Sequence, residues 1–242
     1  MSRLLKNSVM PILLRAQQLQ GKRQFGDQPE EKVQPFDYAF ESRRIYRLDG
    51  PDRGGKDLAW RLLTLLERPT AGELLVREAA TSRLGDAALA ELRNREVGYV
   101  FPTPYLLPGF TVVENVAMPL FKVLQVDPAE AKEITEELLG ITGLSGVTEE
   151  TPDGLTALQQ QVAALARAVI HRPSLLGIES LGKSLAPRDA LLFSEVCQRL
   201  VNHFGLTAVV TVAPGTETAW SSVILEVANG TVQEVVKAHP SQ

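Results

Sequence analysis

The hydrophobic positions of this chain follow two spacings that alternate along its length. Short apolar runs predict six β-strands, at 44–48, 74–77, 96–101, 174–178, 208–212 and 223–227. Apolar residues at helical spacing predict helices, at 58–66, 112–124 and 128–139. Strands that alternate with helices are typical of an α/β fold built on a parallel sheet.

Three stretches refine this pattern. The nearly continuous apolar run 208–212 indicates a central strand that is covered on both faces. Asn229 and Gly230 lie between two alternating runs and predict a hairpin turn. The polar stretch 21–35 predicts a loop.

The strand signals stop between 103 and 154, where helical spacing takes over. We therefore expect a single domain over 1–242, with a core subdomain formed by 10–101 and 160–236 and an inserted helical subdomain at 102–159. Pro102, Pro104 and Pro108 restrict the backbone at the entry to this insertion, which predicts a stiff connection.

Composition excludes several functions. The formal net charge of −4 gives no basic surface for nucleic acid. One cysteine, Cys197, rules out an internal disulfide and a cysteine-rich metal cluster, and the three histidines are scattered without ligand spacing, so no metal site is expected.

The first 14 residues lack the uninterrupted apolar stretch of a signal peptide. No window reaches the roughly 18 to 20 consecutive apolar residues that span a bilayer. We expect a cytoplasmic protein that meets the membrane only through a partner.

Residues 50–57 read GPDRGGKD between a predicted strand and a predicted helix. Gly50, Gly54, Gly55 and Lys56 fit the spacing of a phosphate-binding loop, in which backbone N–H groups converge on phosphate oxygens and the lysine neutralises charge. Asp57 stands where such loops place the hydroxyl that coordinates magnesium.

The Asp57 carboxylate would repel the phosphates of a nucleotide, and Asp52 adds a second negative charge. A carboxylate in the first turn of a helix also caps free N–H groups and complements the helix dipole. We therefore hypothesise that Asp57 supplies internally part of the charge that nucleotide would bring. The alternative is a glycine-rich turn that never meets phosphate, with Lys56 as a solvated surface lysine.

Longer stretches carry a family resemblance. Residues 62–73 read LLTLLERPTAGE, residues 91–101 read ELRNREVGYVF, and residues 106–120 read LLPGFTVVENVAMPL. These stretches resemble ABC-transporter ATPases of the lipoprotein-release and macrolide-export branch, and 163–168 with 171–176 resemble the signature helix and the strand after it. The resemblance implies a P-loop NTPase fold, with a RecA-like parallel-sheet core, an N-terminal antiparallel β region and an inserted helical subdomain.

The resemblance also assigns chemical roles to positions, and most of them are replaced here. Pro102 stands where the family has its sensor glutamine, and Ala157 and Leu158 stand at the signature glycines. Glu179 corresponds to the metal-binding aspartate and could still hold magnesium, whereas Ser180 replaces the glutamate that polarises water.

Two further replacements follow. Ala186 stands for the aspartate of the dimer-facing loop, and Val212 stands for the switch histidine. Phe25 is the nearest candidate for the aromatic residue that stacks on adenine, although an ordinary loop or core phenylalanine explains it at least as well.

The family receives a short coupling helix of its membrane subunit near the proline-rich segment. The docking residues implied by the resemblance are Pro102, Tyr105, Leu106, Leu107, Pro108 and Phe110. We expect a pseudo-ATPase that docks on a transmembrane permease-like partner, peripheral on the inner membrane, as a homodimer or a heterodimer. Two alternatives stay open: a slow ATPase that uses Lys56, Glu179 and Asp57 around magnesium, and a sensor that binds ATP without hydrolysing it.

Overall fold

The computed structural model describes residues 11–24, 26 and 29–235, and its strands form two sheets. The strands are β1 (Ile12–Arg23), β2 (Glu31–Glu41), β3 (Ile45–Asp49), β4 (Ala71–Val76), β5 (Ala79–Ala80), β6 (Val97–Val100), β7 (Leu175–Leu181), β8 (Thr207–Val212), β9 (Val223–Ala228) and β10 (Thr231–Val235). The helices are α1 (Lys56–Leu63), α2 (Asp86–Glu96), α3 (Val112–Pro119), α4 (Pro128–Thr142), α5 (Ala157–Val169) and α6 (Pro187–Phe204), with a π-helical turn η2 (Leu120–Leu124) after α3.

The larger sheet has the strand order β10-β9-β3-β8-β7-β6. All its neighbouring strands are parallel except β10, which pairs antiparallel with β9 across the turn at Asn229 and Gly230. Every residue of β8 is buried between β3 and β7. The predicted strands, the central place of 208–212 and the closing hairpin are therefore confirmed.

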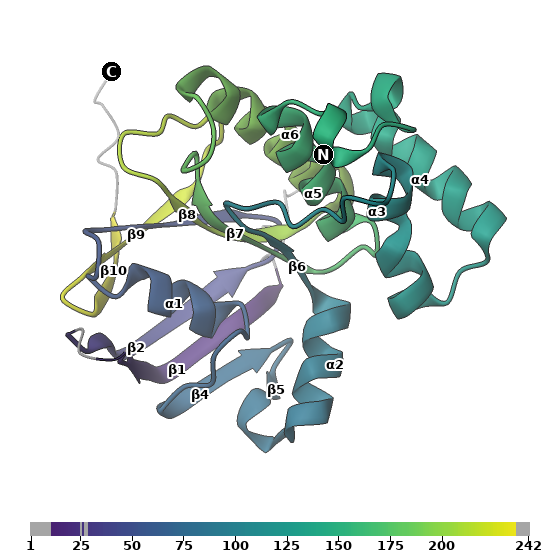
Figure 1. Cartoon of the computed structure of the whole chain (residues 1–242). Helices are drawn as coiled ribbons and strands as arrows, with labels where there is room; N and C mark the ends of the chain where they lie inside the picture. The colour runs from purple at the N-terminus through teal and green to yellow at the C-terminus, as the bar shows by residue number, and fades with distance from the viewer. Residues whose placement is uncertain (1–10, 25, 27–28, 236–242) are drawn as a thin grey trace, which may run out of the picture.

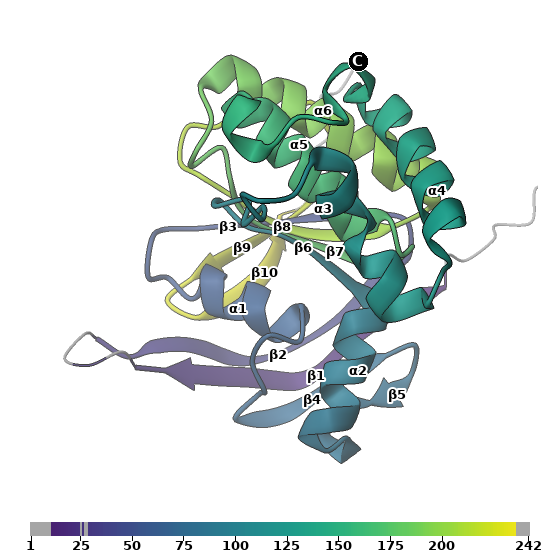
Figure 2. The ribbon, with the colours of Figure 1, turned by 45° about the vertical axis from the view of Figure 1, so that its right-hand side comes forward.

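Helix α1 lies between the two sheets, while α3, α4, α5 and α6 cover the opposite face of the larger one (Figures 1 and 2). Trp60 anchors α1 because its fully buried indole Nε1–H donates to the backbone oxygen of Val209 in β8, at 3.0 Å. The phosphate loop before α1 is thereby fixed against the sheet.

The prediction of a loop over 21–35 is wrong at both ends, although residues 24, 26, 29 and 30 lie outside the strands. Strand β1 extends to Arg23, β2 begins at Glu31, and the two pair antiparallel, with Arg23 opposite Glu31. Arg23 and Glu31 form an ion pair across the end of this ladder, and Lys32, which lies opposite Lys22, pairs with Glu30 instead. The smaller sheet, with the order β2-β1-β4-β5, is the N-terminal antiparallel region that the family resemblance implied.

The segment between β6 and α5 contains α3, η2 and α4, as the helical spacing predicted. Thr111 and Glu114 form a capping box at the start of α3, and Asp127 caps α4. In the part of the chain that the structure describes, no helix combines the length and apolar character needed to cross a bilayer.

Candidate functional site

The glycines of the phosphate loop lie against the backbone of the protein itself. Gly50 and Gly55 have φ values of 149° and 101°, which glycine adopts easily. A Cβ atom on Gly50 would lie 2.0 Å from the Val227 oxygen, and one on Gly55 would lie 2.4 Å from the Lys32 oxygen. Both glycines are therefore required by packing, whether or not a phosphate binds.

The β9–β10 turn connects the phosphate loop to β2. The Gly230 N–H donates to the Gly54 oxygen at 2.8 Å, and the Gly230 oxygen accepts from the Gln34 N–H at 2.8 Å. The turn thus joins the loop to an edge strand of the smaller sheet.

Lys56 is buried, so the surface-lysine alternative is wrong. Its Nζ donates to the Gly50 oxygen at 3.0 Å and forms an ion pair with Asp52 at 3.3 Å. The ammonium group that would neutralise phosphate charge is directed back into its own loop.

Asp57 does not cap α1 as predicted. No side-chain cap is present at this helix start, and the buried Oδ1 of Asp57 has no hydrogen-bond partner among the described residues. Burial raises the pKa of Asp57; Lys56 opposes this shift and Glu31 adds to it. The carboxylate therefore sits in an unfavourable environment for its charge.

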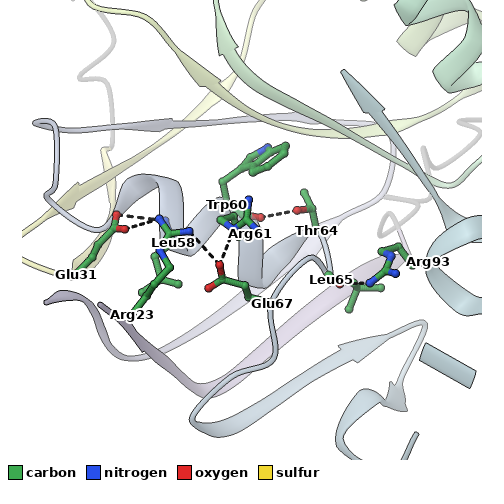
Figure 3. A network of polar contacts seen from close by, with 9 residues as sticks. All are labelled: Arg23, Glu31, Leu58, Trp60, Arg61, Thr64, Leu65, Glu67 and Arg93. Carbon is green, nitrogen blue, oxygen red and sulfur yellow. Dashed lines mark hydrogen bonds and ion pairs between the residues drawn. The ribbon is translucent and has the colours of Figure 1, made fainter. Parts of the chain in front are cut away.

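Glu31, and not Asp57, accepts a hydrogen bond from the first turn of α1. Its Oε1 accepts a long hydrogen bond of 3.4 Å from the Leu58 N–H, and its Oε2 forms an ion pair with Arg23 at 2.6 Å (Figure 3). Arg23 also pairs with Glu67 at 2.9 Å, and Glu67 accepts from Arg61 at 2.6 Å. A charged network thus joins β1 and β2 to α1 and to Glu67 in the segment that follows α1.

Glu179 and Ser180 lie at the end of β7, next to the loop. Burial raises the pKa of Glu179; the charge of Arg61 opposes this shift and Asp57 adds to it. Ser180 has a φ of 46°, and its N–H donates to the Thr211 hydroxyl at 2.7 Å. Among the described residues, no three His, Cys, Asp or Glu side chains form a group that could hold a metal ion.

The other positions at which the family resemblance implied catalytic residues lie in packing contacts or at the beginnings of helices. Gln161 is buried on α5, and its Nε2 donates to the Pro102 oxygen at 2.5 Å. Ala157 and Leu158 open α5 behind a capping box of Thr156 and Gln159. Ala186 is the residue before the first turn of α6 and makes no side-chain cap, and Val212 is the buried end of β8.

The backbone of the proline-rich segment is bound by Arg167 of α5. The Arg167 guanidinium donates to the Pro104 oxygen at 2.7 Å and to the Tyr105 oxygen at 2.8 Å. Tyr105, Leu107 and Phe110 remain 65%, 42% and 43% exposed, Pro108 is exposed, and Leu106 and Pro102 are half-buried. Four of the six predicted docking residues are therefore open to a partner.

An apolar groove of about 460 Å³ continues this surface across α3, η2 and α4. Its apolar lining residues are Phe110, Val113, Ala117, Met118, Phe121 and Pro128, and Glu114 and Lys132 lie with them. Phe110 belongs to both surfaces, so the segment and the groove form one continuous patch.

Sequence reasoning missed Glu31, Gln161 and Arg167, whose contacts join distant parts of the chain. Local sequence gave no sign of them, except that charged Arg23 and Glu31 lie in facing halves of one hairpin. Phe25, the candidate for adenine stacking, lies outside the described residues.

The profile of the ABC transporter family matches residues 33–178. The lipoprotein-releasing system ATP-binding protein LolD of Geobacter metallireducens is 36% identical over 163 residues, which are 67% of this chain and 72% of its own. LolD of Koribacter versatilis is 33% identical over 186 residues, 77% of this chain and 83% of its own. The fold resembles the dimeric ATP-binding cassette MJ0796 bound to ADP and phosphate, with a TM-score of 0.79 at 22% identity, over 92% of this chain and 98% of that one. This chain belongs to the ABC transporter family, as an ATP-binding cassette.

Proposed function

We propose that this cassette has lost ATP turnover and acts as a structural or regulatory subunit, docked beneath a membrane permease. One contrast carries the proposal. Lys56 and the Leu58 N–H are engaged by contacts within the chain, whereas exposed apolar side chains line the proline-rich segment. An exposed apolar surface suited to a partner thus accompanies a nucleotide site whose lysine and helix start already have partners within the chain.

The residues at the reaction centre support the loss of turnover. Ser180 is a poor base for water, and Val212 offers no side-chain hydrogen bond to a γ-phosphate. Losing a positioned general base alone typically removes about 10²- to 10⁴-fold in rate. Asp57 adds a carboxylate where the phosphates and magnesium would lie.

The docking proposal rests on Tyr105, Leu107, Pro108 and Phe110. Aromatic and aliphatic anchors of this kind carry most of the binding energy of protein interfaces. The curated relatives named LolD belong to lipoprotein-releasing systems, so the partner proposed here is a permease of the lipoprotein-release type, on the cytoplasmic face of the inner membrane. Pairing with a second cassette, identical or different, is part of the proposal, since MJ0796 is dimeric in its solved structure.

Retention of Lys56 and Glu179 favours a second candidate function. These two residues keep a cation and a carboxylate at the loop and at the end of β7, which would suffice for weak binding of ATP and magnesium. In that case the chain is a nucleotide sensor or a slow ATPase.

Affinity purification of the tagged chain from its native membranes tests the docking. The wild type is expected to retain a multi-span membrane protein. Phe110→Ser is expected to lose it, while Leu192→Ser, which replaces an exposed leucine on α6, retains it. Equal recovery with both variants would contradict the proposed surface.

Turnover is measured separately, with phosphate release at millimolar ATP and magnesium. We expect no release above that of a Lys56→Ala variant. Release that depends on Lys56 would establish the slow ATPase, and ATP binding without release would establish the sensor.

A further inference from the structure

The first turn of α1 is occupied by a carboxylate from another strand. Glu31, the first residue of β2, accepts from the Leu58 N–H at 3.4 Å. The carbonyl oxygen of the next residue, Lys32, comes so close to Gly55 that no side chain would fit there. The beginning of β2 therefore lies directly over the phosphate loop and the helix that follows it.

Backbone N–H groups at this point of a phosphate loop are the groups that hold the α- and β-phosphates of a nucleotide. They bind anions because they have no intrahelical partner and lie at the positive end of the helix dipole. Glu31 offers one of them, the Leu58 N–H, an anion that belongs to the chain.

The Glu31 side chain is held in this position from the other side. Arg23 donates to Glu31 at 2.6 Å and to Glu67 at 2.9 Å, and Arg61 also donates to Glu67 (Figure 3). The Arg23 and Glu31 side chains are only 17% and 14% exposed, so solvent screens their ion pair weakly. Arg23 thus fixes the carboxylate at the helix start.

We propose that Glu31 is an internal substitute for nucleotide phosphate, which closes the start of α1 against external anions. The inference goes beyond the loss of turnover, because it identifies the group that occupies the site and the residue that holds it there. It assigns a binding role to β2, which none of the family-like motifs predicted.

The substitute explains how the loop keeps its shape without a ligand. Lys56 pairs with the Asp52 carboxylate and donates to the Gly50 oxygen, and the N–H of Leu58 donates to Glu31. Removal of the Glu31 side chain would release the Leu58 N–H and take one carboxylate away from the Arg23 guanidinium. The vacated space would then lie beside the Leu58 N–H and the positive charge of Arg23, which favours a small phosphate anion there.

The test titrates inorganic pyrophosphate into the full-length wild type and three variants, by calorimetry and by thermal shift. Glu31→Ala is expected to bind pyrophosphate about tenfold or more tightly than the wild type, since it gains a charge-assisted contact. Glu31→Gln keeps an acceptor for the Leu58 N–H without the charge. Its affinity for pyrophosphate is therefore expected to lie between those of the wild type and Glu31→Ala. Glu67→Ala is the matched control, because it removes the Glu67 carboxylate from Arg23 and leaves Glu31 in place.

Unchanged affinity in both folded Glu31 variants would overturn the inference, and so would an equal gain in Glu67→Ala. Should Glu31→Ala fail to fold, Glu31→Gln alone decides: a gain over Glu67→Ala supports the inference, and no gain refutes it. These outcomes are independent of the proposed function, whose failure would instead be seen as ATP turnover by the wild type or as the absence of a membrane partner.

Discussion

Asn115 and Leu107 are joined by hydrogen bonds in both directions. The Asn115 Oδ1 accepts from the Leu107 N–H at 2.7 Å, and its Nδ2 donates to the Leu107 oxygen at 3.2 Å. The same amide nitrogen reaches the oxygens of Phe110 and Thr111, both at 3.0 Å. One fully buried side chain on α3 thereby sets the path of the exposed segment that we propose for docking.

Replacing Asn115 by alanine is expected to cost about 1–3 kcal/mol of unfolding free energy, because the Leu107 N–H loses its partner. The docking segment should also become more mobile, which amide hydrogen exchange would show as faster exchange over residues 105–110. Asn202→Ala, an exposed asparagine on α6, is the control and should change stability by less than about 0.5 kcal/mol. Equal protection of the segment in both variants would contradict this role.

Gly50→Ala is expected to destabilise the protein by about 2–4 kcal/mol even without nucleotide. The added methyl group would collide with the Val227 oxygen in β9 at a φ of 149°. Gly85→Ala is the matched control, because nothing lies within 4 Å of the added Cβ there. Chemical denaturation measures both, and a stable Gly50→Ala variant would show that the loop is free to move away from β9.

Asp57→Ser should stabilise the protein at neutral pH. Burial raises the pKa of Asp57 in the folded state above its ordinary value, so ionisation of this carboxylate opposes folding at pH 7. We expect a gain of about 0.5–1 kcal/mol, discounted because the group is partly open to solvent. The difference from wild type should shrink as the pH falls through the folded pKa toward the unfolded value. A loss of stability on replacement by serine would show that the Asp57 charge supports the loop.

His171 gives the opposite dependence on pH. Its ring is buried, neither nitrogen has a hydrogen-bond partner among the described residues, and burial lowers its pKa. The unfolded chain therefore takes up a proton below a pH of about 6.5 that the folded protein resists, and stability falls. Thermal melts over this range should show a smaller decline for His171→Leu than for wild type or for His203→Gln on α6. An identical decline in all three proteins would rule out His171 as the cause.

The parts of the fold that sequence predicted are those that local pattern determines. The apolar runs of β3, β7 and β8 and the turn at Asn229 and Gly230 depend on neighbouring residues alone. The spacing of the phosphate loop is equally local. The predictions of these strands and of the turn were confirmed.

The errors arise where distant charges meet. Arg23 and Glu31 make the 21–35 stretch polar, yet they neutralise each other across two strands. Asp57 was predicted to cap α1, but Glu31, 27 residues from Leu58, reaches the helix start instead. Gln161 contacts the backbone of Pro102, 59 residues away. The sequence alone does not show which of these residues contact each other, because tertiary packing brings them together from distant parts of the chain.

Strand β3 lies between β8 and β9, and the Gly230 N–H completes the contacts of the loop that follows β3. During synthesis, this early strand therefore leaves the ribosome well before either of its neighbours. Its edges stay unpaired until almost the whole chain has emerged, and an unpaired strand is prone to associate with other chains. A chain that ended before β9 would keep one such edge permanently, so stalled or prematurely ended synthesis should yield aggregates rather than a smaller stable domain.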